Sequence, residues 1–211
     1  MNFLAHSALA FDDPALLAGQ FAGDFVRGRD LSGFPPRVAG GIRLHRRVDA
    51  FTDAHPELVA ARAAFEPPLR RHAGIVIDVV FDHLLAGCWP DPAGRSLPAH
   101  ALWVDDALAR HAAALPERLA AFAVRLARER LLERNAEVAS VGFTLERLSR
   151  RSDRMAPLAA AAEDIEPVIE RLRLPFERFW PSLEAMATDW LAAWEVTDAG
   201  GGVAGEHARE G

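Results

Sequence analysis

The stretch GIRLHRRVDAFTDAHP, residues 41–56, places His45, Asp49 and Asp53 four residues apart and sets three arginines, Arg43, Arg46 and Arg47, close to them in sequence. An α-helix advances 100° per residue, so side chains four positions apart drift by only about 40° around its axis. On a helix that begins at the proline pair 35–36, these metal-binding residue types lie within or beside the apolar arc. A solvated helix carries its carboxylates on the opposite side. This helix is therefore expected to turn them toward the interior.

A second stretch, AGIVIDVVFDHLLAG at residues 73–87, predicts a helix that is apolar around almost its whole circumference and hence buried. Asp78 and Asp82 lie four residues apart on one face, with His83 rotated by 100° from Asp82. Two buried carboxylates cost several kcal/mol each unless a cation or hydrogen bonds compensate them. Either a divalent metal or ordinary salt bridges to arginines would do so. Carboxylate and imidazole ligands without thiolate suit Mn²⁺, Mg²⁺ or Fe²⁺ better than a structural zinc.

Composition narrows the class of protein. The chain has 211 residues, half of them hydrophobic, and 30 acidic against 24 basic residues give a formal charge of -6. A negative chain of this size is expected to be one globular domain without general affinity for nucleic acid. The single cysteine, Cys88, allows neither an internal disulfide nor a cysteine zinc site. The sequence shows neither a secretory signal nor about 18 uninterrupted apolar residues for a membrane span, so a soluble cytoplasmic protein is expected.

Turn residues and helix formers alternate along the chain, with almost no pattern typical of β-strands. We predict an all-α, single-domain helical bundle over residues 1–196 and a disordered, glycine-rich tail over residues 197–211. The expected helices cover residues 14–27, 36–54, a short segment from 56, 69–88, 99–114, 116–134, 136–151, 156–173 and 176–195.

Two further polar residues in the first part of the chain are candidates for the site. Asp24 follows Gly23 near the end of the first predicted helix, where it could serve as a ligand or pair with Arg27 three residues on. His6 lies in an apolar stretch, and a lone histidine there is more typical of a hydrogen-bonded core residue than of a ligand. Far along the chain, RLARERLLERN at residues 125–135 predicts a solvated helix face of arginines and glutamates.

Several motifs together resemble the acyl carrier protein phosphodiesterase family. The resemblance is dense over residues 1–90 and thins beyond, to RFWP at 178–181. It implies an all-helical fold related to the HD-domain metal-dependent phosphohydrolases, although the usual His-Asp order is reversed here as Asp82-His83. It also implies release of 4'-phosphopantetheine from a serine of holo acyl carrier protein, with Mn²⁺ preferred. The motifs are NFLAH (2–6), GDFVRG (23–28), FPPRVAGGIRLHRRVDAFTDAHP (34–56) and IDVVFDHLLAGCW (77–89).

The resemblance also implies roles for individual residues. Asp53 or Asp24 would orient or deprotonate the attacking water, and Arg27, Arg43 or Arg46 would neutralise charge that develops on phosphorus. Arg43, Arg46 and Arg47 would form a basic rim that steers the acidic carrier protein, or else a solvated helix face. The implied metal ligands are Asp24, His45, Asp49, Asp78, Asp82 and His83.

Two other functions remain open on the sequence. One keeps the metal site but takes a nucleotide or another small phosphodiester as substrate. The other is a helical binding module without metal, in which every buried acid is paired with an arginine. The sequence specifies neither the number of metal ions nor the oligomeric state.

Overall fold

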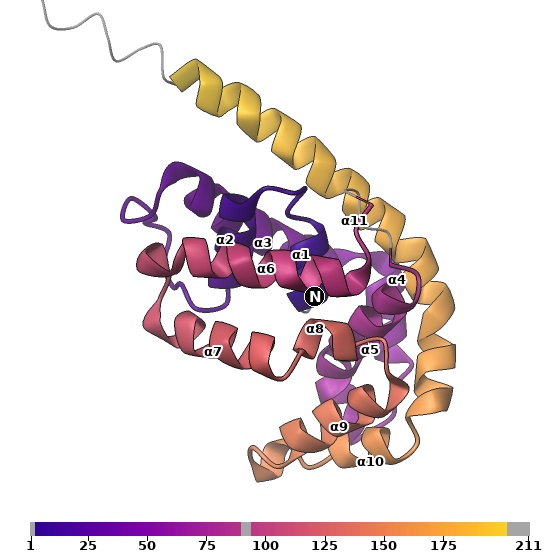
Figure 1. The fold of residues 1–211 in the computed structure, drawn as a ribbon. Coiled ribbons are helices and arrows are strands. Elements are labelled where there is room, and N and C mark those ends of the chain that lie inside the picture. Colours follow the sequence, from indigo (N-terminus) through magenta and orange to yellow (C-terminus); the bar gives the residue numbers. More distant parts are fainter. Residues whose placement is uncertain (1–2, 90–93, 202–211) are drawn as a thin grey trace, which may run out of the picture.

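The computed structural model describes residues 3–89 and 94–201, with side chains described as far as residue 196. These residues form eleven α-helices and three short 3-10 helices, with no β-strand among them, so the predicted all-α, single-domain bundle is confirmed (Figure 1). None of the helices in this part of the chain is long and apolar enough to cross a membrane. The helices are α1 (Phe3–Ala8), α2 (Pro14–Ala22), α3 (Pro36–Ala54), α4 (Pro56–Ala63), α5 (Ala73–Gly87), α6 (Leu97–Arg110), α7 (Glu117–Arg128), α8 (Leu131–Arg134), α9 (Val138–Ser149), α10 (Leu158–Glu163) and α11 (Ile165–Gly201).

Helices α2 and α3 pack with their backbones in direct contact. A Cβ atom at Gly19 would lie 2.1 Å from the Val38 carbonyl oxygen, and one at Gly41 would lie 2.2 Å from the Leu16 carbonyl oxygen. Only glycine permits so close an approach of two helices. The contact fixes the position of α3 against α2, and α3 carries the candidate site residues.

The core surrounds α1 and α5, and α11 curves along one side of the bundle past α10, α9, α5, α4 and α3 (Figure 1). Phe81 of α5 and Phe179 of α11 are fully buried, with ring centroids 5.9 Å apart. Near the other end of α11, the Arg37 side chain bonds Asp13 at 2.5 Å and Glu195 at 2.9 Å. Helix α11 therefore joins the two ends of the bundle.

The last helix is longer than the sequence indicates. A break is expected before Pro175, but α11 continues through both Pro175 and Pro181. Each proline removes one backbone hydrogen bond, and the buried apolar face of α11 outweighs this loss. The helix also extends beyond residue 196 to Gly201, so it includes the first residues of the expected tail. The rest of that tail, residues 202–211, lies outside the described residues.

Two other helices end earlier than predicted. Helix α2 ends at Ala22 and not near residue 27, because Gly23 and Asp24 turn the chain toward α3. The predicted helix 116–134 is divided into α7 and α8 by Arg130, whose φ of 50° is left-handed and interrupts the helical hydrogen bonds. This break orients α8 independently of α7.

Candidate metal centre

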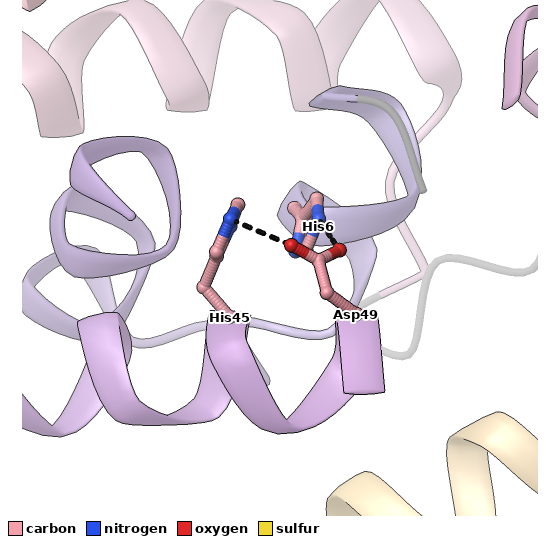
Figure 2. Close-up of side chains that lie close together, drawn as sticks. All are labelled: His6, His45 and Asp49. Carbon is pink, nitrogen blue, oxygen red and sulfur yellow. Dashed lines mark ion pairs between the residues drawn. The ribbon is translucent and has the colours of Figure 1, made fainter. Parts of the chain in front are cut away.

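His45 and Asp49 lie one turn apart on α3, and both side chains point toward His6 of α1 (Figure 2). His45 Nε2 is 3.1 Å from one Asp49 oxygen, and His6 Nε2 is 3.4 Å from the other. The two imidazole rings stack with centroids 4.1 Å apart. Each of the three residues offers one ligand atom, and these atoms lie within 4.8 Å of one another.

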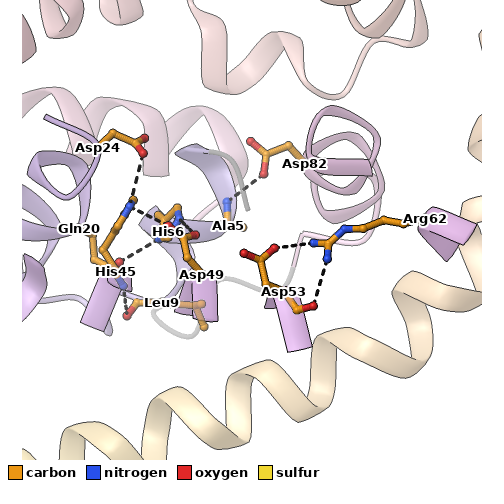
Figure 3. Close-up of polar contacts among 10 residues, drawn as sticks. All are labelled: Ala5, His6, Leu9, Gln20, Asp24, His45, Asp49, Asp53, Arg62 and Asp82. Atoms are coloured by element: carbon orange, nitrogen blue, oxygen red, sulfur yellow. Dashed lines mark hydrogen bonds and ion pairs between the residues drawn. The ribbon is translucent and has the colours of Figure 1, made fainter. Parts of the chain in front are cut away.

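Asp24 joins this group from the segment that follows α2 (Figure 3). Its Oδ1 atom lies 3.5 Å from His45 Nε2. The neighbouring Gly23 makes room for the histidine, since a Cβ atom there would lie 2.2 Å from His45 Cγ. We call His6, Asp24, His45 and Asp49 the histidine–aspartate cluster.

Gln20 of α2 fixes the orientation of the His6 ring (Figure 3). The Gln20 amide nitrogen donates to the Leu9 carbonyl at 3.5 Å, so the Gln20 oxygen accepts from His6 Nδ1 at 2.9 Å. The neutral His6 ring then has its lone pair on Nε2, which faces an Asp49 oxygen. This nitrogen is buried and has no hydrogen-bond partner within the described residues. Two electron-pair donors face each other there, an arrangement that a cation between them would stabilise.

The protonation states of the cluster follow from its geometry. Burial lowers the pKa of His45, but hydrogen bonds to Asp24 and Asp49 outweigh burial and raise this pKa to about 9. Burial and the charge of His45 lower the pKa of His6 to about 4. The hydrogen bond with His45 lowers the pKa of Asp24, and the hydrogen bond with His45 also overcomes burial to hold the pKa of Asp49 well below its usual range. At neutral pH, one positive and two negative charges leave the cluster with a net negative charge.

The donor set fits a divalent cation. Two imidazole nitrogens and two carboxylates, without a thiolate, suit Mn²⁺ or Fe²⁺, and the carboxylates also suit Mg²⁺. The histidines are almost fully buried, whereas the side chains of Asp49 and Asp24 are 42% and 56% exposed. The cluster therefore opens toward solvent on its carboxylate side, as a site that exchanges ligands requires.

Asp82, a predicted ligand, has a different set of contacts. Its two carboxylate oxygens accept the backbone N–H groups of Leu4 and Ala5 at 2.9 and 3.2 Å, at the start of α1 (Figure 3). Burial raises its pKa to about 7, against the opposing effect of these two hydrogen bonds. Asp82 thus holds in place the helix that carries His6. Burial also raises the pKa of Asp78, which lines a neighbouring pocket together with Asp82.

His83 and Asp53 lie apart from the cluster. His83 Nδ1 is 2.7 Å from the Asn135 carbonyl oxygen, on the side of α5 that its rotation of 100° from Asp82 indicates. The Asp53 side chain is 75% exposed and bonds Arg62 at 2.7 Å, because the last turn of α3 lies beside α4 (Figure 3). The helical period places Asp53 near His45 and Asp49, but the end of the helix leaves it in solvent.

The predicted arginines take two kinds of position. The Arg46 guanidinium donates to the Val26 carbonyl at 3.0 Å and so secures the segment that carries Asp24. Arg27, Arg43 and Arg47 are exposed; Arg43 and Arg47 lie on α3, and Arg27 lies three residues after Asp24.

Tertiary contacts also add residues that the sequence pattern alone does not assign to the site. His6 is a hydrogen-bonded core residue, as predicted, and is also a member of the cluster. Its place within the NFLAH motif is the one signal in the sequence that points to it. Gln20 lies in an ordinary apolar helix and carries no such signal.

The fold is all-helical, and its histidine–aspartate cluster groups residue types that can ligate a divalent cation. The sequence profile of the family described as Acyl carrier protein phosphodiesterase matches residues 1–183. Proteins named acyl carrier protein phosphodiesterase from Serratia proteamaculans and Yersinia enterocolitica are 37% and 36% identical to this chain, and both alignments cover 90% of this chain and 98% of the relative. The protein of that name from Pectobacterium atrosepticum is 35% identical, with coverage of 89% and 97%. No solved structure matches the chain significantly.

The chain therefore belongs to the acyl carrier protein phosphodiesterase family, a family of phosphodiester hydrolases. The resemblance seen in the motifs of residues 1–90 is confirmed, and the match extends across most of the second half.

Proposed function

We propose that this protein hydrolyses the phosphodiester that joins 4'-phosphopantetheine to a serine of holo acyl carrier protein, with Mn²⁺ held by the histidine–aspartate cluster. The names of its relatives support the substrate. One observation supports the metal above all: the buried His6 Nε2 faces an Asp49 oxygen at 3.4 Å with no hydrogen-bond partner among the described residues.

His6, His45, Asp49 and Asp24 would hold the ion. When bound, a divalent cation supplies Lewis acidity toward the phosphodiester oxygens and makes water more acidic. His45 must lose its proton for its Nε2 atom to act as a ligand, and Asp24 and Asp49 then turn their negative charge toward the cation. Gln20 keeps the proton of His6 on Nδ1, so that Nε2 stays available.

In the reaction, a water oxygen forms a bond to phosphorus while the bond from phosphorus to the serine oxygen breaks. The serine oxygen takes up a proton, and the products are apo carrier protein and 4'-phosphopantetheine. Asp24 is the most exposed carboxylate of the cluster, so it is placed to accept the proton of the attacking water. Asp53 lies with Arg62 and takes no part in this scheme.

The carrier protein is acidic, and the exposed arginines Arg27, Arg43 and Arg47 offer it a complementary surface. Such a surface raises the rate of encounter even though the whole chain has a charge of -6.

The test is incubation of the purified protein with Mn²⁺ and holo acyl carrier protein, followed by mass spectrometry of the carrier. We expect the carrier to lose the mass of 4'-phosphopantetheine, and addition of a chelator to stop the loss. If the carrier keeps its full mass while a nucleotide phosphodiester is hydrolysed under the same conditions, the proposed substrate is wrong. If metal-free enzyme still removes the prosthetic group from the carrier in the presence of chelator, the proposed metal dependence is wrong.

A further inference from the structure

A second site lies between α5, α7, α8 and α9, in a pocket of about 550 Å³. This volume is in the range of pockets that bind small molecules. Phe3 of α1 and Phe25, which follows α2, close the pocket on the side of the histidine–aspartate cluster. We call it the arginine pocket because five arginines line it: Arg118, Arg125, Arg134, Arg147 and Arg151.

These arginines are poorly compensated by acids. In the described part of the chain, their one ion pair is a long contact of 3.8 Å between Arg147 and Glu129. Burial and the positive charge of Arg125 both lower the pKa of Arg147. On the opposite wall, the Asp82 oxygens are engaged by the backbone of α1. Like charges therefore converge in the pocket and give it a positive potential.

Two of the guanidinium groups have hydrogen-bond donors that are buried and unused. The Nε atoms of Arg125 and Arg147 have no partner among the described residues. A buried donor without a partner costs about 1–3 kcal/mol, a cost that a ligand oxygen would remove. Both side chains are half-buried, so their positions are restricted before any ligand arrives.

The pocket also has an aromatic wall, beside polar residues that include Asp78 and Asp82. Arg125 lies over the ring of Phe122 at 5.3 Å, and Arg134 lies over the ring of Phe143 at 5.7 Å. Phe143 is 53% exposed, which is unusual for so large an apolar side chain. Arginines held against aromatic rings present their edges to an anion, while the rings contact an apolar chain.

The pocket borders the histidine–aspartate cluster at two points. Phe3 precedes His6 by one turn of α1, and Phe25 directly follows Asp24. Asp78 on the pocket wall is also close enough to Asp49 for their charges to interact. The pocket and the cluster are therefore adjacent in the fold.

We propose that the arginine pocket binds a phosphate monoester carried on an extended chain, with Arg125 and Arg147 on the phosphate and the aromatic wall along the chain. The identification of this ligand as 4'-phosphopantetheine rests on the proposed function. A phosphate monoester suits the site better than a carboxylate, because its higher charge and three free oxygens match several convergent guanidinium groups.

The test is isothermal titration calorimetry on the full chain in the presence of a chelator, so that the cluster holds no metal. We expect 4'-phosphopantetheine to bind at least about tenfold more tightly than pantetheine, which lacks the phosphate. Arg125→Gln and Arg147→Gln should each weaken binding by about tenfold or more. Arg150→Gln is the matched control, since Arg150 is exposed directly after α9, pairs with Glu146 and does not line the pocket. Circular dichroism melting checks the fold, and Arg151→Gln replaces any variant that does not fold.

Three results would overturn the inference: equal binding of pantetheine, equal binding by the pocket variants, or tighter binding of decanoate than of 4'-phosphopantetheine. Mass spectrometry of holo carrier protein on the same preparations separates this inference from the proposed function. If the protein hydrolyses holo carrier protein but the arginine variants bind 4'-phosphopantetheine as well as wild type, the proposed ligand site is wrong and the proposed function stands. Arginine-dependent binding of 4'-phosphopantetheine without hydrolysis supports the pocket and refutes the function.

Discussion

The histidine–aspartate cluster and the arginine pocket are neighbours, but the cluster contains charges of both signs and the pocket has an excess of positive charge. In the cluster, His45 lies between two carboxylates at 3.1 and 3.5 Å, and Gln20 satisfies one nitrogen of His6. In the arginine pocket, five cations converge with one long ion pair to Glu129 in the described part of the chain. The cluster combines one positive with two negative charges and is ordered by its own contacts, whereas the pocket carries an excess of positive charge.

This difference separates two kinds of binding. A cluster of mixed charges can keep its geometry without a ligand, and the proposed cation would displace the proton of His45. An unbalanced pocket gains most from a ligand of opposite charge, because that ligand relieves repulsion among its arginines and supplies partners for the buried Nε atoms. Changes in the cluster should therefore affect metal binding and turnover, and changes in the pocket should affect affinity for the product, 4'-phosphopantetheine.

The largest effect is expected from Asp49→Asn. Asp49 contacts both histidines, so the loss of its charge should lower kcat/KM by on the order of 10³-fold and remove bound Mn²⁺. Asp53→Asn, one turn further along α3, is the comparison, and we expect a change of less than about threefold because Asp53 pairs with Arg62 in solvent. Kinetics with holo carrier protein and elemental analysis measure both. Equal losses of kcat/KM and bound Mn²⁺ in the two variants would show that Asp53 belongs to the site.

A smaller effect is expected from Gly23→Ala. The new Cβ atom would meet the His45 ring at 2.2 Å and displace it from Asp24. The shift of the His45 ring that relieves this contact should weaken Mn²⁺ binding and turnover by about 10- to 100-fold. The control is Gly33→Ala, where a Cβ atom has nothing within 4 Å. Normal Mn²⁺ affinity in Gly23→Ala would show that the position of His45 does not matter.

The pH dependence of stability should report the charge of His45. Its pKa is raised to about 9 in the folded state, so its ion pairs stabilise the metal-free protein fully below about pH 6.5, and this stabilisation is lost as the pH rises toward 9. Between pH 6.5 and 8 the loss should be on the order of 1–2 kcal/mol. Urea unfolding with chelator, for wild type and His45→Gln, measures the difference. Parallel pH profiles would mean that His45 is neutral.

The smallest effect on turnover is expected from Arg147→Gln. If Arg147 binds the phosphate monoester, the inhibition constant of 4'-phosphopantetheine should rise by about tenfold with little change in kcat, since the cluster is intact. Arg150→Gln, directly after α9, should change neither value by more than about twofold. A fall in kcat at an unchanged inhibition constant would place Arg147 in the chemical step.

Much of this architecture could be predicted from local sequence patterns. The apolar period and the capping residues indicate the helices, and the spacing of four residues places His45 and Asp49 on one face. Helix boundaries are less predictable. Pro175 indicates a break that the packing of α11 against the bundle overrides, and the left-handed Arg130 divides a segment whose composition is helical throughout.

The limits of prediction are clearest for residues that are similar by sequence and different in space. Asp49 and Asp53 share the face of one helix, yet one contacts two buried histidines and the other is solvated at the helix end. In the stretch 125–135, predicted to be a solvated face, Arg125 and Arg134 line the pocket while Arg128 and Arg130 are exposed.

The sequence by itself determined that the chain is all-helical, that His45 and Asp49 share one face of a helix, and which family it belongs to. These features depend on residues a few positions apart or on motifs read in order along the chain. Only the tertiary structure decided that His6 faces Asp49, that Asp82 holds α1, and that arginines of α7, α8 and α9 converge on one pocket. Such contacts join residues far apart in the chain, and they are fixed by how closely the helices pack, which no local period records.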